Sequence, residues 1–276
     1  MRQGSESFLS SLVSAARETV RSGYYSVEPS TKGKRERDRD RERERKRSLL
    51  AVVKKGVEGR SKLIAEVKFK SPTEGKLAEG DAASIALEYQ RGGAVAVSVL
   101  TEPRAFGGRL EHLIAVKETV ELPVLMKDVV VDRKQVEAAA RLGADAILLI
   151  MSIFQRGMGE QGLDEMVELA HSLGLEVFLE VHSEDEYISA LSSGADIVGI
   201  NNRSLDTLHV TLDVSVELLS KHPHKKPVVC ESGIKTREQI LMLESLGADA
   251  FLVGSHLMKS RDRAGAVTEL TGGKNW

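Results

Sequence analysis

The chain has 276 residues, of which 41% are hydrophobic and 29% charged, and its formal net charge is −2. This composition is typical of a globular protein with one or two cores, and its near-neutral charge argues against a general nucleic-acid binder. The apolar runs are too short to cross a membrane, and Cys230 is the only cysteine, which excludes an internal disulfide. With no secretory leader pattern at its start, we expect a cytoplasmic protein.

Residues 1–47 are expected to form an N-terminal extension, separate from a main domain over residues 48–276. Apolar residues recur at helical spacing over residues 8–20, which predicts a helix. Residues 32–47 contain ten basic and five acidic residues and no apolar one. Without an apolar stripe to bury, this stretch is interpreted as a solvated linker or exposed helical extension. The alternative is a basic arm that binds an anionic partner.

The main domain is expected to begin with a second short helix over residues 48–57, followed by a strand over residues 63–69. Side chains alternate along a strand, so Glu66 and Lys68 share one face. The other face is apolar and must pack against something, which we expect to be helices. A carboxylate and an ammonium group therefore lie side by side on the opposite face of a core strand.

A repeat follows, in which a Gly-Ala step leads into a burst of Val, Ile and Leu. The glycines of this step are 50, 51 and 53 residues apart, at Gly93, Gly143, Gly194 and Gly247. A helix that ends at a left-handed glycine and leads into a buried strand has this pattern. Each interval fits two βα units, and a further apolar run lies midway in each, at residues 122–127, 175–180 and 226–232.

Together these segments give eight predicted strands that alternate with amphipathic helices. The even period favours an α/β fold in which the strands close into a (β/α)8 TIM barrel, with accessory helices at the N-terminus. An open, doubly wound sheet is the alternative.

The predicted strands share a second feature, which is a polar residue near the C-terminal end. In a barrel these ends meet at one rim, where active sites are built. Because unpaired buried ions are costly, we expect the amines and carboxylates to pair and to shift one another's pKa. The alternative is a set of structural ion pairs that closes the barrel mouth. The rim residues are Glu66, Lys68, Lys127, Glu180, Asn201, Arg203, Glu231 and Ser232.

The last two strand-to-helix turns carry Ser232-Gly233 and Gly254-Ser255. Glycine lets backbone N–H groups approach an anion, and a helix N-terminus adds partial positive charge. This pair of loops holds phosphate in many barrels. We therefore predict a phosphate-binding site here, to which Ser71 could add a contact from the turn after the first strand.

At these positions the chain resembles the indole-3-glycerol-phosphate synthases of tryptophan biosynthesis. The matching motifs occur in family order over roughly residues 48–260: IAEVKFKSP, SVLTEPRAFGG, PVLMKD, GADAILLI, FLEVH, GINNRSL, ESGI and LVGSHLM. The resemblance implies ring closure of 1-(2-carboxyphenylamino)-1-deoxyribulose 5-phosphate to indole-3-glycerol phosphate, with loss of carbon dioxide and water. It implies neither a metal nor an organic cofactor. The expected partner is the phosphorylated small molecule, with no nucleic acid and no membrane, and the chain is expected to be a monomer or weak oligomer.

The resemblance also implies roles. Lys127 is the leading candidate for the acid that drives ring closure, and Glu180 for the base or the stabiliser of positive charge on the anilino nitrogen. Lys68, partnered by Glu66, could hold the substrate carboxylate or act as the acid in dehydration. Which lysine serves which step stays open.

The remaining predicted residues bind or orient the substrate. Asn201 would orient hydroxyl groups, while Arg203 and Glu231 would act as charge partners that set the geometry. Phe106 would pack against the substrate ring or, alternatively, anchor its own loop. In the family an N-terminal extension lies over the catalytic rim, and the sequence leaves open whether residues 8–20 do so here. The predicted phosphate contacts are Ser71, Ser232, Gly233, Gly254 and Ser255.

Two rival functions remain. One is a phosphosugar aldolase that uses Lys127 or Lys68 as a nucleophilic amine in a Schiff base. The other is a non-catalytic binding protein that keeps the barrel as a scaffold, with the charged arm gripping a partner.

Overall fold

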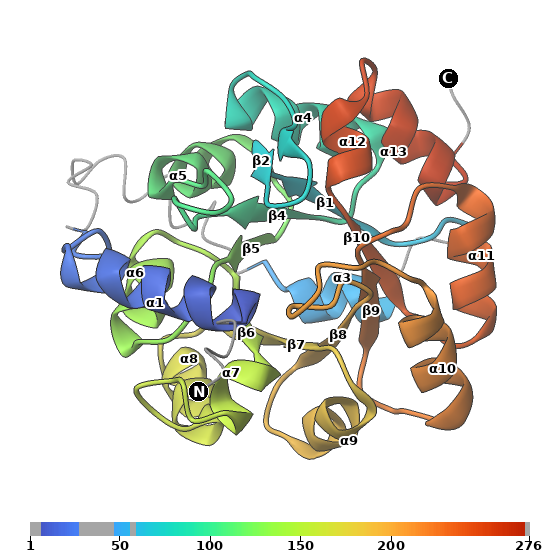
Figure 1. Cartoon of the computed structure of the whole chain (residues 1–276). Helices are drawn as coiled ribbons and strands as arrows, with labels where there is room; N and C mark the ends of the chain where they lie inside the picture. Colours follow the sequence, from blue (N-terminus) through green and yellow to red (C-terminus); the bar gives the residue numbers. More distant parts are fainter. Residues whose placement is uncertain (1–6, 28–46, 56–58, 274–276) are drawn as a thin grey trace.

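The computed structural model of the chain describes residues 7–27, 47–55 and 59–273, so most of the charged stretch 32–47 lies outside the described residues. Eight parallel strands close into a barrel with helices around it (Figure 1). The first strand pairs with both the second and the last, which excludes the open doubly wound sheet. The barrel strands are β1 (Leu63–Val67), β4 (Ala96–Leu100), β5 (Val124–Lys127), β6 (Ala146–Ile150), β7 (Glu176–Val181), β8 (Ile197–Asn201), β9 (Val228–Glu231) and β10 (Ala250–Val253).

Strand alternation divides the core into an outer layer and a barrel interior. Ala65 and Val67 of β1 pack in the layer between strands and helices, as predicted, while Ile64 packs inside the barrel with Phe178. The interior is crowded, because a Cβ on Gly199 would lie 2.1 Å from the Phe178 ring. Glycine at this position makes room for a large aromatic side chain from the neighbouring strand.

The barrel helices lie between successive strands, and two short helices, α7 and α12, follow β6 and β10 directly. A two-stranded hairpin, β2 (Lys70–Ser71) and β3 (Gly75–Lys76), follows β1. No described helix is long and apolar enough to cross a membrane. The helices are α4 (Ala82–Gly92), α5 (Leu110–Thr119), α6 (Arg133–Arg141), α7 (Met151–Gln155), α8 (Leu163–Ser172), α9 (Glu184–Ser192), α10 (Asp213–Lys221), α11 (Arg237–Ser245), α12 (Ser255–Lys259) and α13 (Arg263–Thr271).

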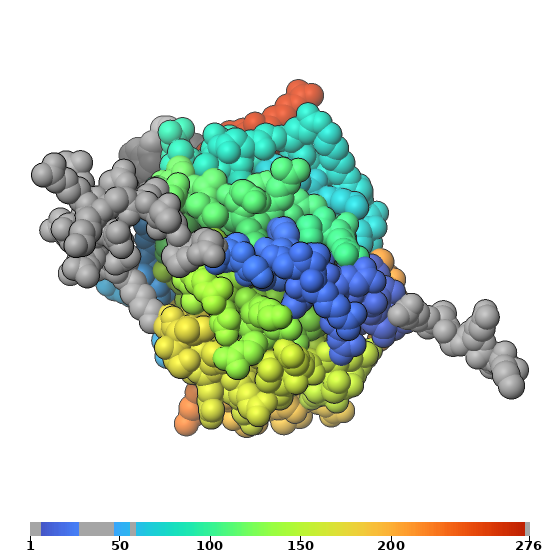
Figure 2. All heavy atoms as spheres, turned by 90° about the vertical axis from the view of Figure 1, so that its left-hand side faces the viewer, coloured from blue at the N-terminus to red at the C-terminus, as the bar shows by residue number. Residues whose placement is uncertain are grey.

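Helix α1 (Phe8–Arg21) confirms the helix predicted over residues 8–20, and it packs on the C-terminal rim. Its buried Leu9 and Leu12 belong to the same apolar cluster as Ile150 at the end of β6 and Val129 just beyond β5. Arg17 on its outer side donates a hydrogen bond of 2.7 Å to the carbonyl of Met158. Figure 2 shows α1, in blue, lying on the outside of the molecule against segments from the middle of the chain.

Helix α3 (Leu49–Lys55), the second predicted helix, closes the opposite end. Glu176, the first residue of β7, accepts hydrogen bonds from the Ser48 hydroxyl at 2.5 Å and from the Leu50 N–H at 2.8 Å. Leu49 and Val53 are fully buried against the barrel interior. The two accessory helices therefore lie at opposite ends of one barrel.

Candidate active site

A cavity of about 730 Å³ opens at the C-terminal end of the barrel. Its lining includes apolar side chains of α1 and the residues at the ends of the strands. Ser71 is buried and its hydroxyl lies 3.1 Å from that of Thr73, so Thr73 rather than Ser71 lines the cavity. The other predicted site residues all line it, namely Glu66, Lys68, Phe106, Lys127, Glu180, Asn201, Arg203, Glu231, Ser232, Gly233, Gly254 and Ser255.

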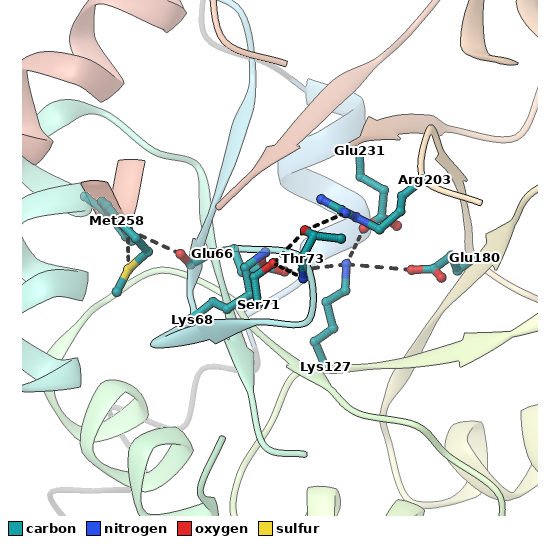
Figure 3. Close-up of polar contacts among 10 residues, drawn as sticks. Glu66, Lys68, Ser71, Thr73, Lys127, Glu180, Arg203, Glu231 and Met258 are labelled. Carbon is teal, nitrogen blue, oxygen red and sulfur yellow. Dashed lines mark hydrogen bonds and ion pairs between the residues drawn. The ribbon is translucent and has the colours of Figure 1, made fainter. Parts of the chain in front are cut away.

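Lys127, the last residue of β5, lies at the centre of the charged cluster (Figure 3). Its Nζ forms an ion pair with Glu231 and lies 3.5 Å from Glu66 Oε2 and 3.7 Å from Glu180 Oε2. Burial alone would lower the pKa of Lys127, but the three carboxylates raise it above the ordinary value for lysine. The side chain is therefore an ammonium group and not a free amine at neutral pH.

Glu66 connects this lysine to Lys68, whose Nζ lies 2.5 Å from Glu66 Oε1. Burial would raise the pKa of Glu66, but the two ammonium groups more than offset it and hold that pKa below its ordinary value. A Cβ on Gly254 would lie 2.2 Å from Glu66 Oε1. The glycine predicted to bind phosphate therefore also leaves space for a carboxylate of the cluster.

Glu180 and Glu231 are both buried, but their environments shift their pKa values in opposite directions. Burial raises the pKa of Glu231 to about 8. Lys127 lowers this pKa, but the negative charges of Glu180 and Glu66 oppose that effect. For Glu180, burial is outweighed by His182 and Lys127, so its pKa is lowered. Carboxyl groups with separated pKa values beside one ammonium group can divide acid and base roles between them.

The loop after β8 links this cluster to the β2–β3 hairpin. The Asn201 side chain helps to lower the pKa of Glu180, and its Oδ1 accepts the Arg203 N–H at 2.9 Å. The Arg203 guanidinium donates to the Thr73 hydroxyl at 2.9 Å. Glu231 forms an ion pair with Lys127 and not with this guanidinium.

The turn after β9 has a left-handed backbone at two successive residues, Ser232 (φ 66°) and Gly233 (φ 82°). A residue other than glycine is held in this region only when its surroundings fix it, and such strain is typical of functional loops. Here Asn202 supplies the support, because its Nδ2 donates to the carbonyls of Glu231 at 3.0 Å and Ser232 at 3.2 Å. Ser232 and Gly233 thus face the cavity from a fixed turn.

Sequence comparison identifies the family. The model of the indole-3-glycerol phosphate synthase family matches residues 13–270. The chain belongs to this family. It is 39% identical over 217 residues to the indole-3-glycerol phosphate synthase of Campylobacter jejuni subsp. doylei, which covers 78% of the chain and 83% of the relative. It is 44% identical over 199 residues to that of Aliarcobacter butzleri, covering 72% and 74%.

Solved structures support the fold. The N-acetylmannosamine-6-phosphate 2-epimerase from Clostridium perfringens superposes with a TM-score of 0.57 at 20% identity, covering 75% of the chain and 90% of the epimerase. The thiamine phosphate pyrophosphorylase from Pyrococcus furiosus gives a TM-score of 0.54 at 20% identity, covering 76% and 93%. At this identity the likeness shows the barrel fold alone.

In this member of the indole-3-glycerol phosphate synthase family, two buried carboxylates missed in the sequence hold parts of the site in place. Glu102, just after β4, accepts backbone N–H groups from Arg104, Ala105 and Phe106 at 2.9, 2.7 and 3.0 Å, which fixes the loop that carries Phe106. Its signal in the sequence was its place in the SVLTEPRAFGG motif, which does not reveal these contacts.

Asp128, next to Lys127, is the second of these carboxylates. It accepts hydrogen bonds from the hydroxyl groups of Tyr25 at 2.9 Å and Thr101 at 2.5 Å, and burial raises its pKa to about 7. The Tyr25 hydroxyl therefore ties the segment after α1 to the strand end that carries Lys127. His182 and Asn202 were missed as well.

Proposed function

We propose that the chain closes the indole ring, converting 1-(2-carboxyphenylamino)-1-deoxyribulose 5-phosphate to indole-3-glycerol phosphate with release of carbon dioxide and water. The observation that carries this proposal is the charge cluster. Two ammonium groups and three carboxylates from four strands line one cavity, beside a fixed turn suited to an anion. Family membership independently supports the same reaction.

In the first step a carbon–carbon bond forms between the aromatic carbon that bears the carboxylate and the carbonyl carbon of the substrate. Lys127 donates a proton to the carbonyl oxygen, which becomes a hydroxyl group. Because its pKa is raised, Lys127 holds its proton until that oxygen becomes strongly basic. The ionised Glu180 stabilises the positive charge that develops on the anilino nitrogen.

Decarboxylation follows. The bond to the carboxyl carbon breaks, carbon dioxide leaves, and the electron pair restores the unsaturated ring. Burial raises the pKa of Glu231 to about 8, and this carboxyl group pairs directly with Lys127. It is therefore placed to return a proton to Lys127 for the next step.

Dehydration then removes the new hydroxyl group as water, which takes one proton from an acid, while a base removes one proton from the ring being formed. Either Lys68 or Lys127 can supply the acid, since both line the cavity. Glu180 is the proposed base, because its lowered pKa keeps it ionised. Asn201 would orient the substrate hydroxyl groups.

The phosphate at one end of the substrate and the aromatic carboxylate at the other each have complementary groups in the cavity. The phosphate would bind at the turns of Ser232-Gly233 and Gly254-Ser255, with Lys68 available to the carboxylate. The aromatic ring would contact Phe106 and the apolar side chains that α1 adds, Phe8 and Leu12. Ser71 would act indirectly, through Thr73.

The Schiff-base aldolase is disfavoured because a nucleophilic amine must be neutral, whereas three carboxylates keep Lys127 protonated. A binding protein without catalysis is disfavoured by the cost of gathering several buried charges for no chemical purpose.

The test is a fluorescence assay for the indole product with the wild type, Lys127→Ala and Glu180→Gln. Each substitution should lower kcat by about 10³-fold, the range for loss of a general acid or base. Lys221→Ala, which removes an exposed lysine on α10, is the control and should keep full activity. Full activity in both site variants, or a borohydride-trapped adduct with substrate, would contradict the mechanism.

We also propose that residues 48–276 form the catalytic domain, that residues 1–47 extend it, and that the chain works in the cytoplasm as a monomer or weak oligomer. The free, buried Cys230 is compatible with a reducing compartment. The large exposed apolar side chains of the described residues are divided among α9, α11 and the end of α8. Light scattering at assay concentrations would test the oligomeric state.

A further inference from the structure

His182 lies behind Glu180, and the mechanism above does not use it. It follows β7 two residues after Glu180, so both side chains point to the same side of the strand. Both ring nitrogens are shielded from solvent, and they contact the neighbouring carboxylates as ion pairs and not through well-aligned hydrogen bonds. Nε2 lies 3.2 Å from Glu180 Oε1, and Nδ1 lies 3.6 Å from Glu186 Oε2. The imidazole is therefore placed between two carboxylates in a buried space.

Glu186, on the far side of the imidazole, is fixed by other contacts. Its Oε1 accepts the Ser152 hydroxyl at 2.5 Å, and its Oε2 accepts the backbone N–H of His182 at 2.7 Å. These bonds join β7, α7 and α9 without help from the imidazole ring. The contact between the ring and Glu180 is therefore not needed to hold these three elements together.

The two oxygens of Glu180 have separate partners. Oε1 faces His182, and Oε2 faces Lys127 at 3.7 Å. A carboxylate held through one oxygen presents the other in a fixed direction, which is how a base is oriented by a third group in many enzymes. Oε2 is the atom that faces Lys127, and Glu180 lines the cavity.

The charges around His182 favour its imidazolium form. Burial would lower its pKa, but Glu180 and Glu186 raise that pKa to about 9. Arg156, at the end of α7, has its own ion-pair partner in Asp206. Among the described residues, the charged or hydrogen-bonding groups that face this site are Glu180 of β7, Lys127 of β5, Asn201 of β8, Glu186 of α9 and the uncharged Ser152 of α7.

We propose that His182 is a positioning residue for ring closure, which keeps Glu180 ionised and holds its Oε1 so that Oε2 faces Lys127 and the substrate. This inference rests on the proposed role of Glu180. Without the imidazolium, Glu180 would face the carboxylates of Glu231 and Glu66 with Lys127 as the shared cation. It would then take up a proton at a higher pH.

Two substitutions separate charge from orientation. His182→Gln keeps a hydrogen-bond donor but removes the charge, so kcat should be near wild type at about pH 8. The acidic limb of its profile of kcat against pH should move to higher pH by about one unit. At low pH this shift lowers kcat about tenfold. His182→Leu removes both and should lower kcat about 10²-fold at every pH, as expected for a misplaced catalytic group.

His171→Gln is the matched control, because His171 contacts Asp196 at 2.9 Å outside the site. It should leave kcat and the pH profile unchanged. Circular dichroism at each pH measures the folded fraction, by which all rates are corrected. The double variant Glu180→Gln, His182→Gln should be no slower than Glu180→Gln alone.

An unshifted pH profile in His182→Gln, or full activity in His182→Leu after correction, would overturn the proposal. NMR of ¹⁵N-labelled imidazole gives a readout that does not require activity. His182 should be protonated at about pH 7.5 in the wild type and should titrate at lower pH in Glu180→Gln. A neutral His182, or one that is indifferent to Glu180, would also overturn it. A wild type that makes no indole product would instead refute the proposed function.

Discussion

Two helices from the N-terminal region cover the two ends of the barrel. One end is sealed, and the other keeps a cavity. At the N-terminal end, α3 seals the interior with fully buried Leu49 and Val53. At the C-terminal end, α1 covers the rim but leaves a cavity of about 730 Å³ in which charged side chains meet. Apolar contacts at one end stabilise the fold, whereas the buried charges at the other end cost stability and are the groups to which we assign the chemistry.

Leu49→Ala should therefore show most clearly that the N-terminal end of the barrel contributes to stability and not to activity. It leaves a void at the N-terminal end, and we expect the free energy of unfolding to fall by about 3 kcal/mol. The kcat of the folded protein should not change, since the cavity lies at the other end. Urea unfolding and the product assay measure the two quantities. Leu173→Ala, at an exposed leucine beyond α8, is the control, and a kcat loss in Leu49→Ala alone would show that the ends are coupled.

Gly254→Ala should have the reverse effect, with a larger loss of activity than of stability. The new methyl group would lie 2.2 Å from Glu66 Oε1 and must displace this carboxylate from Lys68 and Lys127. We expect kcat/KM to fall by about thirtyfold, roughly 2 kcal/mol, with a smaller effect on unfolding.

Gly162→Ala is the control for this change, because a Cβ there has its nearest neighbour at 3.8 Å. It should be as active as the wild type. Equal loss of activity in the two variants would mean that the close approach to Glu66 is not what matters at Gly254.

Leu12→Ala tests whether α1 serves the cavity or only the fold. Leu12 is buried and lines the cavity, so we expect KM to rise about fivefold, near 1 kcal/mol, with kcat almost unchanged. Leu9→Ala on the same helix is also buried but does not line the cavity. It should lose similar stability and keep the wild-type KM, and a matching rise in its KM would assign α1 a structural role alone.

Glu18→Gln should have the smallest effect. Glu18 pairs with Arg104 between α1 and the loop that carries Phe106, but both side chains are largely exposed. Exposed pairs contribute about 0.2–1 kcal/mol, and salt weakens them. We expect KM to change by less than about twofold, and only at low ionic strength. A larger change that persists at high salt would show that this ion pair closes the cavity.

The strands and accessory helices could be predicted because their signals are local. A Gly-Ala step followed by an apolar run marks a helix end and a buried strand, and the left-handed glycine predicted there is found at Gly93, Gly143 and Gly247 but not at Gly194. Period-two alternation also placed Glu66 and Lys68 on the interior face. The predicted cluster of Lys127, Glu180 and Glu231 followed from these positions together with the rule that strand ends meet at one rim.

The partners within the site could not be predicted, because they depend on how the closed barrel staggers its strands. Only this stagger brings Lys127 of β5 into contact with Glu231 of β9, four strands later in the chain. It also places the Arg203 guanidinium within hydrogen-bond distance of the Thr73 hydroxyl. Glu102, Asp128, His182 and Asn202 all lie within the family motifs of the sequence, but a motif does not give the contacts that each residue makes.

The sequence by itself determined which residues alternate inward, where each strand ends and which chemical groups the rim contains, because these properties depend on spacing along one chain. The tertiary structure alone decided which ammonium group meets which carboxylate, that α1 and α3 close opposite ends, and that His182 reaches Glu180. These are distances between segments far apart in the sequence, and they are fixed only when the barrel closes and its side chains pack.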